Sequence, residues 1–162
     1  MTNEVLAARG ITLQCAASGD RLSVEKLQRE AYARNRALLG VEPLPLNADY
    51  AAIFRDFEVW IKPAPVLQDG IDAALILDTD RSGDILIWSV ATRPAAQSGG
   101  LGRALLACAD ERARQLGRSQ IRLYTGQPLT HLIDWYARNG YEVERTETLP
   151  DRSIAHMLKP LA

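Results

Sequence analysis

The chain has 162 residues, and a domain of this size buries enough surface to fold without disulfides or a bound metal. Its 47% hydrophobic and 24% charged residues are typical of a globular protein and exclude disordered and fibrous classes. The net charge of −1 argues against nucleic acid and membrane surfaces as partners. No apolar run approaches the roughly 18 residues of a membrane span. Two cysteines fit a reducing compartment, so we expect one cytoplasmic domain over residues 1–162, with no secretory signal and no metal site.

The charges are distributed unevenly along the chain. Residues 1–80 hold 8 Lys/Arg against 12 Asp/Glu, net −4, whereas residues 81–145 hold 9 Arg against 6 Asp/Glu, net +3. This imbalance is either chance scatter or the sign of a polyanionic ligand held by the second half, opposite an acidic surface that attracts a cation. The sequence alone leaves both interpretations open.

The first half of the chain predicts a strand, two helices and an irregular strand. We expect the strand over residues 11–16, a helix that Ser23 caps and Gly40 ends, and a second helix beginning at Asn47. Two prolines interrupt the strand near residue 63, which is therefore bulged or at a sheet edge.

The second half alternates strands and helices. Residues 85–88 are uniformly apolar, so we place the strand over residues 84–92 at the sheet centre, buried on both faces. The remaining elements are a strand over 71–77, a helix over 101–116, a strand over 119–125, a helix over 130–138 and a hairpin over 141–158. The order β-α-α-β-β-β-α-β-α-β-β combines antiparallel meanders with one βαβ crossover. The fold class is therefore α/β (α+β), with a single mixed, mostly antiparallel twisted sheet and helices on both faces.

The most informative segment is the turn between the strand over 84–92 and the helix that follows. It reads Gln97-Ser98-Gly99-Gly100-Leu101-Gly102-Arg103. A helix N-terminus carries unpaired N–H groups and a partial positive charge, and glycines let these donors converge without a Cβ in the way. Arg103 can add a charge-assisted hydrogen bond. The turn therefore predicts a phosphate-binding cradle, unless its glycines serve only helix–strand packing.

Two common phosphate motifs do not fit this turn. A P-loop requires a lysine after its last glycine, and this segment has none. A dinucleotide fingerprint requires Gly or Ala where Leu105 stands.

A third pattern does fit. The run Q-x-x-G-x-G over residues 97–102, after a strand that ends at Pro94, resembles the acyl-CoA signature of the GNAT superfamily of acyl-CoA-dependent N-acyltransferases. Residues 135–141 resemble the second motif of that superfamily, and the element order resembles its sheet. The resemblance implies a central V-shaped splay in the sheet and acetyl-CoA (coenzyme A) as cofactor.

The resemblance also implies roles for individual residues. The backbone of Val90 and Thr92 would pair with the pantetheine amides of acetyl-CoA as though the cofactor were an extra strand. Tyr136 stands where the superfamily keeps a tyrosine that protonates the departing thiolate, or it simply packs beside Trp135. The residues that would bind the cofactor through the glycine turn are Gln97, Ser98, Gly99, Gly100, Leu101, Gly102 and Arg103.

The sequence departs from the superfamily pattern in two places. Many members carry a glutamate as general base on the central strand, where this chain has Trp88, which either walls an apolar acceptor pocket or belongs to the core. Leucines also replace two asparagines that relatives often have before the tyrosine. The residues left as candidate bases are Asp84, Glu58 and His131.

We therefore expect an N-acetyltransferase that moves an acetyl group from acetyl-CoA to a primary amine by direct transfer in a ternary complex. The acceptor is a small molecule or a peptide, arriving over the acidic first helices. The alternatives are a catalytically weak or silent acyl-CoA-binding sensor or subunit, and a protein that binds another phosphorylated ligand. An edge strand and the C-terminal hairpin offer surfaces through which a homodimer could pair.

Overall fold

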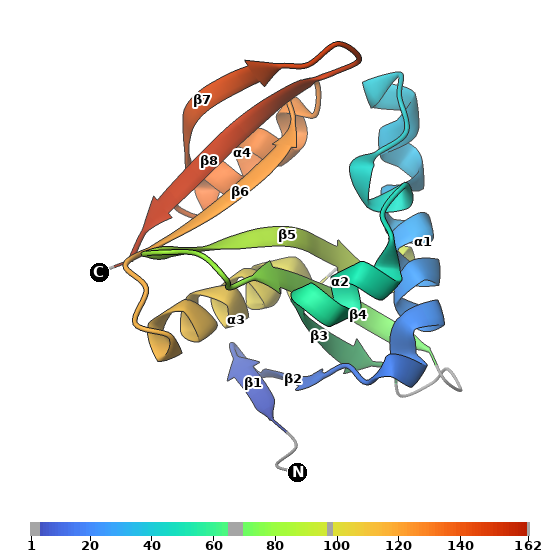
Figure 1. The fold of residues 1–162 in the computed structure, drawn as a ribbon, viewed down its shortest axis with the longest axis vertical. Coiled ribbons are helices and arrows are strands. Elements are labelled where there is room, and N and C mark those ends of the chain that lie inside the picture. The colour runs from blue at the N-terminus through green and yellow to red at the C-terminus, as the bar shows by residue number, and fades with distance from the viewer. Residues whose placement is uncertain (1–3, 65–69, 97–98, 162) are drawn as a thin grey trace.

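The computed structural model describes residues 4–64, 70–96 and 99–161, and its strands form one mixed sheet (Figure 1). The order of the strands in the sheet is β1-β2-β3-β4-β5-β6-β8-β7. They are β1 Val5–Ala8, β2 Ile11–Cys15, β3 Glu58–Pro63, β4 Ile71–Asp78, β5 Asp84–Thr92, β6 Gln120–Gly126, β7 Glu142–Thr148 and β8 Ser153–Pro160. The helices are α1 Arg21–Leu39, α2 Tyr50–Asp56, α3 Leu101–Gln115 and α4 Thr130–Arg138. Within the described ranges only β5 and β6 pair in parallel, which confirms the mixed, mostly antiparallel sheet.

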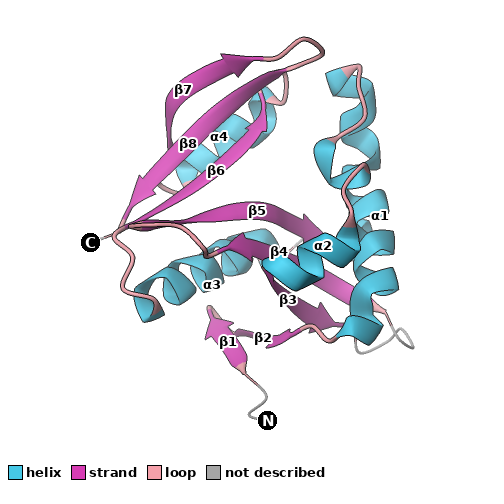
Figure 2. Ribbon diagram, in the orientation of Figure 1, coloured by secondary structure: helices cyan, strands magenta, loops and turns pink. Residues whose placement is uncertain are grey.

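Helices cover both faces of the sheet, as the sequence predicts (Figure 2). Helices α1 and α2 pack on one face, where Val24, Leu27 and Ile53 join a buried cluster with residues of β3 and β4. Helices α3 and α4 pack on the other face. Cys108 of α3 is fully buried there, and burial raises the pKa of its thiol to about 11, so this cysteine is a packing residue.

The ends of two helices correct the sequence-based prediction. Helix α1 begins at Arg21, before Ser23, although it ends at Gly40 as expected, in the left-handed conformation with φ 71°. The cap of α2 is Asp49, whose carboxylate accepts hydrogen bonds from the backbone N–H groups of the next turn, and not Asn47.

Three strands, β1, β4 and β5, differ from expectation. Strand β1 was not predicted; it forms a hairpin with β2 at the sheet edge and buries Leu6 completely. Strand β3 is bulged at Pro63, which confirms the first of the two predicted alternatives, and it lies between two partners. The strand with both faces buried is β4, whereas β5 alternates, because one of its faces borders a pocket.

The centre of the sheet is splayed. The β5/β6 ladder pairs Asp84–Ile87 with Gln120–Leu123 and then stops, although β5 continues to Thr92 and β6 to Gly126. Figure 1 shows the two strands starting side by side and spreading apart. On the β4 side, Ile76 pairs with Ser89 and Leu77 with Ile87, so Trp88 is an extra residue. Such a bulge bends a strand, and here it turns β5 away from β6.

Candidate functional site

A pocket of about 460 Å³ occupies the splay. The strands β5 and β6 form its two edges, and helices from both faces of the sheet complete its walls. These walls are formed by the C-terminal half of α1 with the loop after it, by the first turn of α3, and by α4.

The backbone of β5 faces the pocket at alternate residues. Arg93 donates its backbone N–H to the carbonyl oxygen of Asp72 at 2.7 Å, so Arg93 pairs with the β4 side. In an antiparallel ladder, neighbouring residues direct their N–H and C=O groups to opposite sides. Val90 and Thr92 therefore direct theirs away from β4, toward the splay. The Tyr32 hydroxyl, which donates to the Val90 carbonyl at 3.3 Å, reaches it from that side.

The first turn of α3 opens on the same pocket. Gly99 and Gly100 both have left-handed backbone, with φ of 94° and 83°, and no side chain of a described residue caps the helix. The first hydrogen bond within the helix runs from Ala104 N to Gly100 O. The N–H groups of residues 101–103 therefore have no acceptor within the helix. A Cβ on Gly102 would lie 3.0 Å from the ring of Trp135, so α4 packs directly on this backbone. Gln97 and Ser98 lie outside the described residues.

Tyr136 of α4 lines the pocket from the α3 side. Its ring lies 5.0 Å from that of Trp135 and 5.9 Å from that of Tyr141. Its hydroxyl makes no hydrogen bond with a described residue. Burial, together with the nearby Tyr32, raises the pKa of the Tyr136 phenol, so the group is held in its protonated form.

Opposite Tyr136, a buried polar network joins α1 to β5. Gln28 and Ser89 hydrogen-bond each other at 2.9 Å, and the Tyr32 hydroxyl lies 3.0 Å from Ser89 Oγ. Burial raises the pKa of Tyr32 despite this bond. Residues 28, 32 and 35 lie on one side of α1, three to four residues apart. Sequence reasoning missed these residues, although polar residues on the buried face of a helix are a detectable signal.

Comparison with known proteins identifies the family. The acetyltransferase (GNAT) domain model matches residues 59–143, more than half of the chain, and the match contains both splayed strands and the glycine turn. The chain belongs to the GNAT family of acetyltransferases. A comparison with curated protein sequences found no match.

Solved structures of other GNAT proteins have the same fold. The ribosomal-protein-S18-alanine N-acetyltransferase of Escherichia coli is 17% identical, with 93% of each chain covered and a TM-score of 0.69. A Bacillus subtilis acetyltransferase in complex with CoA is 15% identical, covering 98% of this chain and 100% of its own, with a TM-score of 0.68. A GNAT acetyltransferase from Elizabethkingia anophelis with acetyl-CoA bound is 14% identical, covering 95% and 100%, with a TM-score of 0.67.

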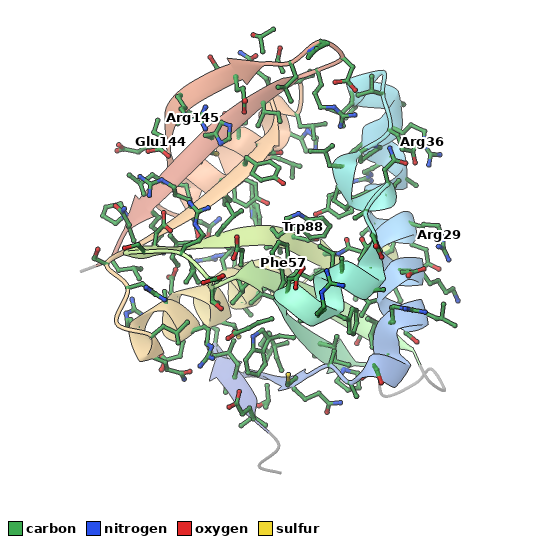
Figure 3. All side chains as sticks on the ribbon, viewed as in Figure 1. Arg29, Arg36, Phe57, Trp88, Glu144 and Arg145 are labelled. Carbon is green, nitrogen blue, oxygen red and sulfur yellow. The ribbon has the colours of Figure 1, made fainter. Side chains whose placement is uncertain are left out.

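Trp88 of this GNAT chain both lines the pocket and packs against the core, which are the two alternatives considered for it. Its ring packs edge-on to Tyr50 at 6.2 Å and against Phe57 at 6.1 Å (Figure 3). It is half-buried, and its remaining surface lines the pocket. Trp88 is therefore an aromatic wall anchored in the α2 side of the core.

Two of the three candidate bases lie elsewhere in the GNAT fold. Asp84 is hydrogen-bonded to two arginines, and Glu58 accepts two hydrogen bonds from Arg112, at 2.7 and 2.9 Å. Neither lines the pocket, whereas His131 does. Among the described residues, no Asp or Glu lines the pocket at all, so the acidic surface expected from the charge distribution does not extend into it.

Two contacts join the halves of the sheet across the pocket. Leu39, the last residue of α1, packs so closely on Gly126 of β6 that a Cβ there would collide with it. Arg152, just before β8, donates from Nη1 to the carbonyl oxygen of Glu42, in the loop after α1, at 3.0 Å. The pocket is thus bounded by protein at the end where β5 and β6 lie farthest apart.

Within the described ranges, no cluster of three or more His, Cys, Asp or Glu side chains could hold a metal ion. No helix in those ranges is long and apolar enough to cross a membrane.

Proposed function

We propose that this GNAT protein transfers an acetyl group from acetyl-CoA to a primary amine, directly within a ternary complex. The observation that carries the proposal is the splay between β5 and β6, which opens beside the glycine-rich first turn of α3. A strand-shaped ligand with a diphosphate at one end fits this combination.

The residues around the splay fit acetyl-CoA. Val90 and Thr92 direct backbone groups into the splay, where they would pair with the two pantetheine amides. The N–H groups at the start of α3 would bind the pyrophosphate, since side chains are absent from Gly99, Gly100 and Gly102 and Leu101 contributes only its backbone. Arg103 is exposed on that turn and would add a charge-assisted hydrogen bond. Gln97 and Ser98 stay predicted members of this site.

Acetyl-CoA supplies the thioester, whose acetyl carbon the amine attacks and whose sulfur departs as a thiolate. The Tyr136 hydroxyl would give that thiolate its proton. Because burial raises the pKa of Tyr136, the phenol is protonated at neutral pH and can serve as the donor. Tyr32, whose hydroxyl is bonded to Ser89 and the Val90 carbonyl, would hold β5 in position beside the acyl group.

The amine must reach the thioester as a free base. No described carboxylate lines the pocket to take its proton. Trp88 stands where the resemblance to the superfamily would place a glutamate. His131, at the pocket wall, is the candidate that the geometry leaves. The scarcity of bases is also the observation that favours the alternative of an acyl-CoA-binding sensor without turnover.

Two experiments test the proposal. A melting scan with acetyl-CoA at about 100 times its dissociation constant should stabilise the protein by about 2.7 kcal/mol, and absence of a shift at millimolar cofactor would contradict both enzyme and sensor. An assay of thiol release with a panel of amines then separates them, because a sensor binds the cofactor but releases no thiol above the rate without protein. A cytoplasmic location and pairing into a homodimer are further predictions.

A further inference from the structure

Asn35 is an unusual buried polar residue. It is 5% exposed, it lines the pocket, and its side-chain amide makes no hydrogen bond with a described residue. Four other buried polar residues do have partners: Gln28 and Ser89 bond each other, and Asp72 and Asp84 are ion-paired with basic residues. Its polar atoms are nevertheless accessible from the pocket, so a molecule bound there can hydrogen-bond the Asn35 amide. Asn35 therefore points to a ligand with polar atoms at the α1 wall.

The charges around Asn35 indicate the sign of that ligand. Arg34 precedes it on α1, lines the pocket, and has no ion-pair partner among the described residues. Arg152 lines the pocket as well, with its side chain 12% exposed and one carboxylate partner, Asp151. The described part of the pocket wall holds no carboxylate to balance these guanidinium groups. A second positive charge on the acceptor would be repelled, whereas a carboxylate would be attracted.

Much of the remaining pocket wall is apolar. This part includes Trp88, Pro43, Leu44, Leu129, Leu132 and Ile154. The contacts of Leu39 with Gly126 and of Arg152 with Glu42 bound this end, so the space suits a compact body and not an extended chain.

We propose that the acceptor is a small amine that also carries a carboxylate and an apolar group, such as an amino acid with an apolar side chain. This inference rests on the proposed function. Arg34 binds the carboxylate, Asn35 donates its amide N–H to the same group, and the leucines and Trp88 contact the side chain. Polyamines and other multiply cationic amines are excluded, because nothing in the described wall neutralises them.

The test compares amines that differ only in the carboxylate. L-leucine is paired with isoamylamine, and L-phenylalanine with phenethylamine, while spermidine represents cationic amines. Binding is measured by titration calorimetry with coenzyme A present, and kcat/KM by thiol release with acetyl-CoA. We expect each amino acid to exceed its decarboxylated partner by about tenfold or more in both measurements. Equal or weaker binding of the amino acids, or preference for spermidine, would overturn the inference, as would failure of every amine to bind.

Substitutions assign the preference to residues. Arg34→Gln should reduce the leucine-to-isoamylamine ratio at least several-fold, and Asn35→Asp, which introduces a negative charge at nearly constant volume, should reverse it. Arg29→Gln is the matched control, because it removes the same charge from an exposed position of α1 that does not line the pocket (Figure 3). The leucine-to-isoamylamine ratio of this variant should equal that of the unmodified protein. A ratio unaffected by Arg34→Gln and Asn35→Asp would overturn the assignment. The shift in melting temperature with acetyl-CoA is recorded for each variant. No shift in the unmodified protein means that the proposed function fails. A normal shift without a preference for amino acids means that only the proposed acceptor class is wrong.

Discussion

Arg152 and the main-chain oxygen of Glu42 are joined by a 3.0 Å hydrogen bond, although 110 residues separate them in the chain. The bond ties the turn before β8 to the loop after α1, and Figure 1 shows the β7–β8 turn reaching toward the C-terminal end of α1. It is a polar contact that joins the two sides of the splay at the pocket rim.

Replacing Arg152 by Ala should therefore loosen the rim. We expect the free energy of unfolding to fall by about 1–3 kcal/mol, because a largely buried guanidinium loses a carbonyl and a carboxylate partner. The KM for the amine should rise several-fold while acetyl-CoA affinity stays unchanged. Arg145→Ala, with a side chain 58% exposed and 4.0 Å from Glu147, should change the unfolding free energy by less than about 0.5 kcal/mol. Equal effects of the two substitutions in urea unfolding would show that the rim contact contributes no stability.

Tyr136→Phe should lower kcat by about 100-fold, because the departing thiolate loses its proton donor. The affinity for acetyl-CoA, measured by titration, should not change. Unchanged turnover of a good substrate across the pH range would remove Tyr136 from the mechanism.

The neighbouring Tyr141 supplies the control for that experiment and a prediction of its own. Its hydroxyl is buried without a partner among the described residues, and burial raises its pKa. Tyr141→Phe should therefore leave kcat intact and increase the free energy of unfolding by up to about 1 kcal/mol, since an unsatisfied polar atom is removed. A clear loss of stability in thermal unfolding would mean that the hydroxyl is satisfied in solution.

Gly100→Val should weaken acetyl-CoA binding by more than about tenfold. A β-branched residue is strained at φ 83°, so the turn is expected to leave the conformation that directs its N–H groups into the pocket. Gly117→Val imposes similar strain at φ 69°, after the other end of α3, and should reduce the melting temperature without reducing affinity. A folded Gly100→Val protein with full affinity would contradict the pyrophosphate site.

Asp84 predicts a pH-dependent contribution to stability. Hydrogen bonds from Arg81 and Arg122 hold the pKa of this carboxyl below its ordinary value. Its stabilisation is therefore fully present above the unfolded-state pKa of about 3.9 and is lost as the pH falls through the lower folded-state pKa. Asp84→Asn should cost about 3 kcal/mol at pH 7 and progressively less below pH 4, in urea unfolding at each pH. Asp56→Asn, at an exposed ion pair with Arg55, should change little at either pH.

The sequence predicted the parts of the fold that depend on local signals. The glycines of the α3 turn, Gly40 at the end of α1 and the alternation of elements are such signals, and the structure confirms the elements they predict. Capping of α2 was misassigned because Asn47 and Asp49 are both good caps, and only the tertiary position of the preceding loop selects Asp49.

The acceptor end of the pocket could not be predicted in this way. Tyr32 and Asn35 become site residues only because α1 crosses the open end of a sheet whose opening depends on the bulge at Trp88, far along the chain. Their polarity on the buried side of a helix was visible, but the partner of each side chain depends on contacts far apart in the chain. For Tyr32 that partner is Ser89, and for Asn35 it is the proposed acceptor.

The single extra residue at Trp88 reverses the alternation of side chains in the second half of β5. Trp88 and Ser89 therefore lie on the same face of the strand, where Trp88 packs against Tyr50 of α2 and Ser89 hydrogen-bonds Gln28 of α1. Deletion of Trp88 would restore a regular strand and leave Ser89 opposite Ile76, so β5 would lose its bend and the pocket its aromatic wall, while the hydrogen bond to Gln28 would remain.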